Sequence, residues 1–159
     1  DHVSSEVTLP CIRKDFIVHE IQVLEARAAG ASAFLLIVAA LTGEQLQRLL
    51  ALGQNLGLSP LVEVHTADEL RRAEQAGASI IGVNNRNLNS LEIDLRVSQQ
   101  LRNSIPNDAI AIAESGIHTV ADLQMLEDSG YTAFLIGSSL MKSHDPGNHL
   151  RTLINNPST

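Results

Sequence analysis

The segment SPLVEVHTADELRRAEQAGASIIGVNN (residues 59–85) contains one complete unit of the fold that this sequence predicts. Residues 59–65 are almost continuously apolar, as in a strand of a sheet that is covered on both faces. Thr66 can cap the first turn of a helix, and Gly77 can take the left-handed conformation that ends one. Residues 79–85 then form a second apolar strand. A strand, a helix and a strand in this order predict two parallel strands joined by a crossover helix.

The same unit recurs along the chain. The predicted strands start 20 to 30 residues apart and occupy residues 9–16, 33–40, 59–65, 79–85, 109–115 and 133–139. Between them, apolar residues recur with helical spacing, as at Leu46, Leu49, Leu50 and Leu56. The sequence therefore predicts an α/β fold with parallel strands, either a doubly wound open sheet or a (β/α) barrel. A full barrel has eight such units in roughly 200–250 residues, so the six units seen here would make a barrel that is two units short.

Composition and charge argue against several classes of partner. The chain has 159 residues, 44% of them hydrophobic, and 11 Lys and Arg against 18 Asp and Glu give a net charge of −7. No basic cluster offsets this charge, which argues against a nucleic-acid partner, and no apolar run reaches the roughly 18–20 residues that span a bilayer. The single cysteine, Cys11, favours a reducing, cytoplasmic setting. We expect no signal peptide, and the start at Asp1 rather than Met leaves room for a longer parent.

Several common kinds of site have no pattern in this sequence. The six histidines show neither His-x-His nor His-Glu-x-x-His spacing and have no cysteine partners, so we expect no metal. Cys11 lies within the first apolar run and is expected to be buried and inert. Ser138 and Ser139 lack a nucleophile elbow. No Gly-x-Gly-x-x-Gly or phosphate-loop motif follows the first strand, which weighs against a dinucleotide-binding sheet.

Polar residues gather where the predicted strands end, which is where β/α folds form their active sites. Glu63 lies inside an apolar strand, and a buried carboxylate is tolerated when it is paired or does chemistry. A plain ion pair with a neighbouring Lys or Arg is the structural alternative. Lys14 ends the first strand and can act as a general acid, and Glu114 ends the fifth. Asn84 can orient a hydroxyl group or a water molecule, and Arg86 can bind a carboxylate or position a loop.

Two glycine turns predict an anion site. Ser115-Gly116 follows the fifth strand, and Gly137-Ser138 follows the sixth. Short glycine turns leave backbone N–H groups open, and a helix that begins there adds positive potential. Barrels often bind phosphate in the loops after their last two strands. Tight turns without a ligand are the alternative interpretation.

Together these strand-end residues resemble one family, the indole-3-glycerol phosphate synthases, which are (β/α)8-barrel lyases of tryptophan biosynthesis. Six segments carry the resemblance in the family's order and spacing: LPCIRKDF (9–16), LLIVAAL (35–41), LVEVH (61–65), IGVNNRNL (81–88), ESGIH (114–118) and IGSSLM (136–141). The resemblance covers Leu9 to about Leu153, and the KDF and NNRNL runs are among its most specific parts.

The resemblance implies a reaction and a role for each matching residue. The implied substrate is 1-(2-carboxyphenylamino)-1-deoxyribulose 5-phosphate, whose indole ring is closed with loss of CO2 and water and without a cofactor. The implied catalytic residues are Lys14 as general acid, Glu63 as acid and base, and Asn84 and Glu114 as their polar partners. The implied contacts to the substrate's hydroxyl and phosphate groups are Ser115, Gly116, Gly137 and Ser138. The implied walls of the anthranilate pocket are Phe16 and Leu88, and Arg86 is implied to position a loop at the site.

The family's first two barrel strands have no counterpart in this sequence. By resemblance, residues 1–8 are the remnant of the loop before the third barrel strand, residues 9–153 are β/α units 3 to 8, and residues 154–159 are a C-terminal tail. In the family the first strand supplies a glutamate and a second lysine, so we expect the 159-residue chain alone to be inactive or impaired. Its first and last strands would have open edges that invite pairing with another chain or a second copy.

Three functions stay open at this point. The chain is the larger part of such a synthase, or a non-catalytic barrel remnant that self-associates or pairs with another chain. A third possibility is a different phosphate-binding β/α enzyme, such as an isomerase of a phosphoribosyl amine. A strand with Glu-x-Lys upstream of Asp1 would favour the first function. Only the shared phosphate turns support the third.

Overall fold

The computed structural model describes residues 2–155, which form one parallel sheet and its helices. In chain order the elements are α1 (His2–Glu6), β1 (Ile12–Arg13), α2 (Glu20–Ala28), β2 (Ala33–Ile37), the 3-10 turn η1 (Val38–Ala40), α3 (Gly43–Asn55), β3 (Ser59–Val64), α4 (Ala67–Gln75), β4 (Ile80–Asn84), α5 (Arg96–Arg102), β5 (Ile110–Glu114), α6 (Val120–Asp128), β6 (Ala133–Leu135), α7 (Ser138–Lys142) and α8 (Pro146–Ile154).

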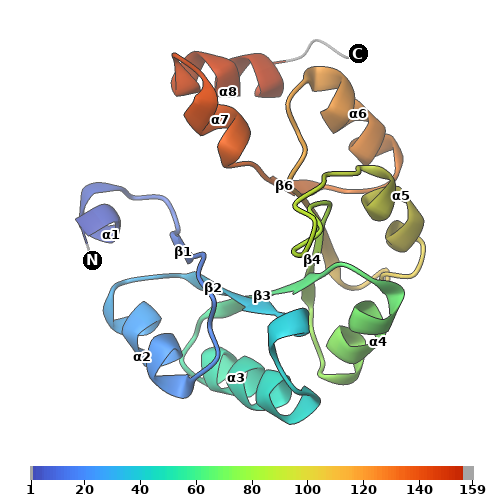
Figure 1. Ribbon diagram of the computed structural model, residues 1–159. Helices are drawn as coiled ribbons and strands as arrows, with labels where there is room; N and C mark the ends of the chain where they lie inside the picture. The colour runs from blue at the N-terminus through green and yellow to red at the C-terminus, as the bar shows by residue number, and fades with distance from the viewer. Residues whose placement is uncertain (1, 156–159) are drawn as a thin grey trace.

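The sheet has the order β1-β2-β3-β4-β5-β6, and every neighbouring pair is parallel. Each strand pairs with the next one along the chain, so the crossover helices all lie on one side of the sheet. Figure 1 shows the result as a curled arc with α2 to α6 on its outer side. Within the described residues, β1 and β6 are the two ends of the arc and do not pair with each other. The predicted incomplete (β/α) barrel is therefore confirmed, and the doubly wound sheet is not formed.

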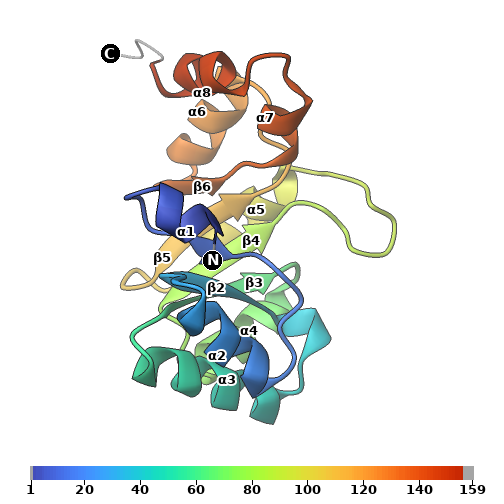
Figure 2. The same cartoon turned by 90° about the vertical axis from the view of Figure 1, so that its left-hand side faces the viewer.

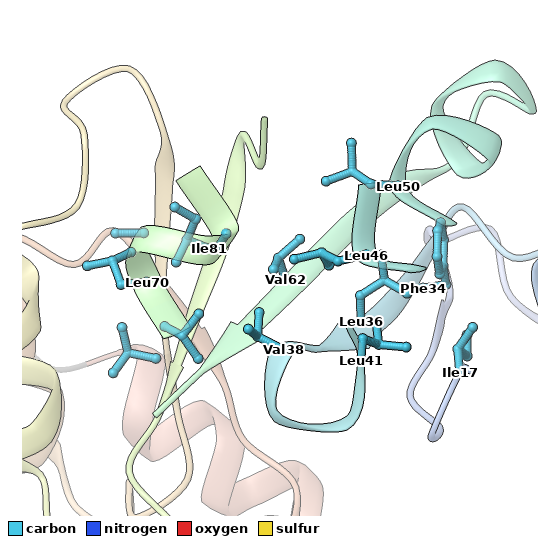
Figure 3. Close-up of a cluster of buried hydrophobic side chains, with 14 of the residues drawn as sticks. Ile17, Phe34, Leu36, Val38, Leu41, Leu46, Leu50, Val62, Leu70 and Ile81 are labelled. Atoms are coloured by element: carbon cyan, nitrogen blue, oxygen red, sulfur yellow. The ribbon is translucent and has the colours of Figure 1, made fainter. Parts of the chain in front are cut away.

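Alternate residues of each strand face two different environments. On the outer face, Phe34 and Leu36 of β2 pack against the helix layer that includes Leu46 and Leu50 of α3, as Figure 3 shows. On the inner face, a smaller apolar cluster fills the hollow of the arc, formed by Leu35, Ile37 and Leu61 with Ile80, Ile112 and Leu135 packed against it. Because the side chains alternate along a strand, Leu61 places Glu63 on this same inner face.

Threonine caps three of the helices, including the one predicted at Thr66. Thr42 and Thr119 both form capping boxes at the starts of α3 and α6. Thr66 accepts a hydrogen bond from the N–H of Glu69, but the Glu69 side chain reaches back to His65 instead of Thr66. Gly77, predicted to end a helix, has a φ of 84°, which an L-residue adopts only with strain, and Gly30 (79°) and Gly130 (97°) end helices in the same way.

The strands at the two ends of the arc are shorter than predicted. β1 covers Ile12–Arg13 instead of residues 9–16, because Pro10 has no N–H to donate and Asp15 turns the chain by accepting the N–H of Phe16. Cys11 consequently lies outside β1 and is half-buried, so the prediction of a core cysteine is wrong. As an end strand, β1 pairs only with β2 among the described residues.

Two other strands end early because the chain turns into a helix. The predicted strand at 33–40 stops at Ile37, where its pairing with Glu63 ends, and residues 38–40 form η1. The predicted strand at 133–139 stops at Leu135, since Ser138 already begins α7. The remaining three strands lie within one residue of their predicted bounds at each end.

The two ends of the described chain are helical. α1 lies within the predicted loop remnant, where the Ser4 hydroxyl donates to the carbonyl of Ala29. α8 includes Ile154, the first residue of the predicted tail, and residues 156–159 of that tail lie outside the described residues. Between residues 2 and 155, every helix is too short or too polar to cross a membrane.

Candidate active site

A cavity of about 420 Å³ opens at the carboxyl ends of the strands. Ten of the eleven predicted site residues line this strand-end cavity: Lys14, Phe16, Glu63, Asn84, Arg86, Leu88, Ser115, Gly116, Gly137 and Ser138. The eleventh, Glu114, lies beside it with Oε2 3.8 Å from Nζ of Lys14. The loop between β4 and α5, which contributes Arg86 and Leu88, projects from this edge of the sheet (Figure 2). The fold therefore brings all the predicted site residues together.

Lys14, Glu63 and Glu114 form a cluster of one ammonium group and two carboxyl groups. Nζ of Lys14 lies 3.6 Å from Oε2 of Glu63 and 3.8 Å from Oε2 of Glu114. The two glutamate side chains are 1% and 0% exposed, whereas Lys14 keeps 44% of its side chain exposed. Oε2 of Glu63 and both oxygens of Glu114 have no hydrogen-bond donor among the described residues. Buried polar atoms are rarely left without partners, so this cluster fits a site whose ligand supplies them.

The two glutamates differ in what they can do with a proton. The pKa of Glu114 is raised to about 8 by burial and by the charge of Glu63, against the opposing effect of Lys14. Glu114 therefore holds a proton at neutral pH and can donate it. Glu63 is fixed by Asn84, whose Nδ2 donates to Oε1 at 3.0 Å. The same Asn84 accepts the N–H of Arg86, which ties the following loop to the site.

Gly82 makes room for the Glu114 carboxyl group. It pairs with Glu63 on one side and with Ile112 on the other, so it lies on the inner face between the two glutamate strands. A Cβ atom at position 82 would meet Oε1 of Glu114 at 1.9 Å and Cδ1 of Leu61 at 3.1 Å. The absence of a side chain at Gly82 is thus required for the present position of Glu114.

We expect Gly82→Ala to destabilise the fold by about 1–3 kcal/mol, because the buried carboxyl group and Leu61 must both move. Urea unfolding monitored by circular dichroism measures this change. Gly43→Ala is the matched control, since a Cβ at this exposed position would meet no described atom within 4 Å beyond its chain neighbours and the backbone of its own helix, and we expect a change below about 0.5 kcal/mol. Equal stability of the two variants would show that Glu114 does not depend on Gly82.

The two predicted anion turns lie at the ends of neighbouring strands. Ser115 and Gly116 follow β5 with φ values of 65° and 83°, so two successive residues take the left-handed conformation. At Gly116 a Cβ atom would also meet Ile93 at 2.6 Å, which restricts this position to glycine. Gly137 and Ser138 face the cavity from the end of β6. Concave turns lined by backbone N–H groups bind phosphate and other anions.

Apolar side chains surround the mouth of the strand-end cavity. Phe16 and Leu88 line it and are 63% and 39% exposed, and Ile93 stands beside them. Exposed apolar groups around a cavity with a few polar groups are typical of a site for an aromatic ligand. Arg86 donates from its guanidinium group to the carbonyl of Leu91 at 3.5 Å, which bridges the two sides of the projecting loop.

Sequence reasoning missed Asn85, which anchors the projecting loop. Its Nδ2 donates to the carbonyls of Glu114 and Ser115, and its Oδ1 accepts from Ser98. The hydroxyl of Tyr131 completes this buried network by donating to the carbonyl of Ser98. One signal in the sequence could have identified Asn85. It follows Ile81 and Val83 on the outer, apolar face of the predicted strand, where a polar side chain needs hydrogen-bond partners.

Three further residues line the cavity. Ile93 was missed, whereas His118 and Ser139 belong to the predicted anion loops without a role of their own, and Ser139 is joined to His149 of α8 by a 2.9 Å hydrogen bond. A second polar group, formed by His65 and Glu69, lies behind Glu63 and does not line the cavity. Within residues 2–155, no three His, Cys, Asp or Glu side chains are arranged to hold a metal ion.

Comparisons with known proteins point to one family. A family model described as indole-3-glycerol phosphate synthase matches residues 1–153. The indole-3-glycerol phosphate synthase of Koribacter versatilis is 48% identical over 154 residues, which cover 97% of this chain and 59% of that protein. The protein of the same name from Chlorobium chlorochromatii is 51% identical over 152 residues, covering 96% of this chain and 58% of that protein. The chain thus spans less than three fifths of the length of these relatives.

A solved structure also resembles this fold. The 3-hexulose-6-phosphate synthase from Salmonella typhimurium has a TM-score of 0.76 over 91% of this chain and 71% of that one. At 14% identity this is a likeness of fold alone.

Proposed function

Because the chain belongs to the indole-3-glycerol phosphate synthase family, we propose that it carries the catalytic face of a lyase that makes indole-3-glycerol phosphate. The proposed substrate is 1-(2-carboxyphenylamino)-1-deoxyribulose 5-phosphate, and the reaction is a step of tryptophan biosynthesis. The proposed setting is the cytoplasm, where a lone half-buried cysteine stays reduced.

The meeting of Lys14, Glu63 and Glu114 at one cavity carries this proposal. Nζ of Lys14, directly after β1, lies within 4 Å of carboxylate oxygens of Glu63 in β3 and of Glu114 in β5. Ring closure needs a proton donor at the ketone oxygen, and Lys14 places an ammonium group at the cavity. Dehydration needs a group that both gives and takes a proton, which a carboxyl group does well. Because these groups are held next to one bound substrate, each proton transfer takes place within the complex and needs no separate collision.

In the proposed sequence, Lys14 protonates the ketone oxygen as the aromatic carbon that bears the carboxylate bonds to the ketone carbon. CO2 then leaves from that aromatic carbon, and its bonding electrons restore the aromatic ring. The new hydroxyl group leaves as water with a proton from Glu63, and Glu63 takes a proton from the carbon beside the nitrogen. Two protons enter the substrate and one leaves it, so each turnover consumes one proton. Asn84 and the protonated Glu114 hold Glu63 and the substrate in place.

The remaining cavity residues supply binding in this proposal. The turns at Ser115-Gly116 and Gly137-Ser138 hold the phosphate and hydroxyl groups, while Phe16 and Leu88 contact the anthranilate ring. Arg86 keeps the projecting loop in position over that ring. We propose no nucleic-acid partner, in keeping with the net charge of −7. The outer edges of β1 and β6, unpaired within the described residues, favour pairing with further strands, from the same polypeptide, another chain or a second copy.

Turnover of the proposed substrate, measured by the fluorescence of the indole product, tests this function. We expect residues 1–159 alone to be inactive or slow, because the arc is open between β1 and β6, and we expect activity when two β/α units from the Koribacter relative precede the chain. Sedimentation of both samples checks that a slow sample is not merely aggregated. A folded, monodisperse and still inactive longer chain would contradict the proposal and favour a non-catalytic barrel.

A further inference from the structure

We propose that His65, held by Glu69, is the proton-exchange partner of Glu63 and supplies the proton that each turnover consumes. This inference rests on the proposed function, because that function makes Glu63 change its protonation state. His65 does not line the strand-end cavity. It therefore acts on the substrate only through Glu63 and is a positioning and proton-storing residue.

The geometry is a carboxylate, an imidazole and a second carboxylate in a row. Nε2 of His65 lies 3.4 Å from Oε1 of Glu63, and Nδ1 lies 3.2 Å from Oε2 of Glu69. Only 12% of the His65 side chain and 16% of the Glu69 side chain are exposed. Oε2 of Glu69 also accepts the backbone N–H of His65 at 2.7 Å. Two contacts from the same carboxylate thus fix both the backbone and the ring of His65.

Glu69 determines which ring nitrogen carries the proton. Burial raises the pKa of Glu69, but hydrogen bonds from His65 and the charge of the His65 ring lower it further than burial raises it. Glu69 therefore stays ionised. An ionised carboxylate only accepts hydrogen bonds, so Nδ1 of the neutral ring must be the protonated nitrogen. Nε2 is then left with a lone pair that faces Oε1 of Glu63.

Nε2 of His65 is a buried polar atom with no hydrogen-bond partner among residues 2–155. Its neighbour across the 3.4 Å gap, Oε1 of Glu63, is also an acceptor when Glu63 is ionised. Two facing acceptors repel, and one added proton converts this pair into a hydrogen bond. The structure therefore contains a place for one exchangeable proton next to the proposed acid and base.

Charged groups approach His65 from two elements. Glu63 faces it from β3 and Glu69 from α4, while Lys14 is in contact with the far oxygen of Glu63. Glu92 and Asp94 line the same hollow as His65, a space of about 380 Å³ on the other side of Asn84, which we call the rear hollow. Among the described residues, Glu63 and Glu69 are the carboxylates paired with the ring, whereas Asp94 is paired with Arg96 and Glu92 accepts a hydrogen bond from Ser90.

The proposed exchange balances the proton that decarboxylation consumes. A protonated His65 passes the proton on Nε2 to Oε1 of Glu63, and Glu63 passes a proton from Oε2 to the neutral Nζ of Lys14. The His65 ring is left neutral, with its remaining proton on Nδ1 against Glu69. It regains a proton from water after the product has left the cavity.

Chemical rescue of His65→Ala tests this proposal, in whichever form of the protein turns the substrate over. We expect kcat to fall by about 10–100-fold, as for other residues that support a catalytic group, with KM within about threefold. Imidazole added to the buffer can enter through the rear hollow and is expected to restore most of kcat. Pyrazole has the same shape but is a much weaker base, and is expected to restore little. Glu92→Gln removes a carboxylate from the same hollow without touching His65, and serves as the unaffected control.

Normal kcat in His65→Ala, or equal rescue by imidazole and pyrazole, would overturn the proposal, since shape alone would then explain His65. Nitrogen NMR of the His65 ring in the unmodified protein gives an independent readout that needs no activity. A ring protonated on both nitrogens, or a neutral ring protonated on Nδ1, supports the proposal, and a neutral ring protonated on Nε2 overturns it. If the unmodified protein does not turn the substrate over, the proposed function fails, and the NMR result alone decides whether His65 is poised to exchange a proton with Glu63.

Discussion

Replacing Glu63 by Gln is expected to lower turnover by roughly 10³-fold or more while substrate affinity stays within about tenfold. Gln has nearly the same size and its amide oxygen can still accept the hydrogen bond that Asn84 donates to Oε1. It cannot give or take a proton, so the proposed dehydration loses its acid and base. Initial rates from indole fluorescence measure turnover, and calorimetric titration with an unreactive reduced analogue of the substrate measures affinity.

Two outcomes separate this role of Glu63 from a structural one. Loss of affinity in parallel with turnover would show that the Glu63→Gln substitution disturbs the cavity, because Glu63 also contacts Lys14 and His65. Near-normal turnover would remove Glu63 from the mechanism. Glu92→Gln makes the same chemical change at an exposed position outside the strand-end cavity, and both its turnover and its affinity are expected to remain normal.

The sequence predicted the fold well because its signals are local and repeated. Capping threonines such as Thr42 and Thr119 and the glycines after the helices mark the ends of the helices, and apolar runs mark the strands between them. The strand lengths at the ends of the arc were harder to predict, because β1 and β6 each have only one neighbour within the described residues. A predicted strand such as residues 9–16 continues only as far as a neighbouring strand supplies hydrogen bonds.

The candidate site was predictable only where a side chain is unusual for its place in the fold. Glu63 stands in an apolar run on the inner face, and Ser115-Gly116 and Gly137-Ser138 break the chain directly after strands. Asn85 gave a weaker signal, because its partners lie in α5 and β5, far along the chain. The partners of His65 are close in sequence, but Glu63 and Glu69 contact its ring only because the chain turns from β3 into α4 between them.

The pH dependence of stability is the other large effect that we expect, and it comes from Glu114. The pKa of Glu114 is raised from its ordinary value of 4.5 to about 8, first by burial and then by the charge of Glu63. The folded state therefore keeps a proton that the unfolded state loses, and stability falls with pH wherever the native state binds more protons. The stabilising contribution is fully present below about pH 4.5 and is lost as the pH rises to about 8.

The expected slope is about 1.4 kcal/mol per pH unit, so the total across this window is several kcal/mol. Glu114→Gln replaces the carboxyl group by a neutral amide of the same shape, and is expected to remove this slope and to be more stable than the unmodified protein at pH 8–9. Urea unfolding at one temperature from pH 5 to pH 9 measures both curves. Glu127→Gln, at an exposed position, is the matched control and should follow the unmodified protein.

Salt distinguishes a buried origin of this pH dependence from one in exposed charges. An exposed charge pair is screened when the salt concentration is raised from 0.1 M to 1 M, whereas the cost of burying Glu114 and its repulsion by the buried Glu63 are screened much less. Because burial is the largest cause and Glu114 has no exposed surface, we expect most of the slope to survive in 1 M salt. Parallel curves for the unmodified protein and Glu114→Gln would show that Glu114 is ionised at neutral pH. In that case its proposed contribution as a hydrogen-bond donor to the substrate would be lost, and Lys14 would remain the proton donor facing the cavity.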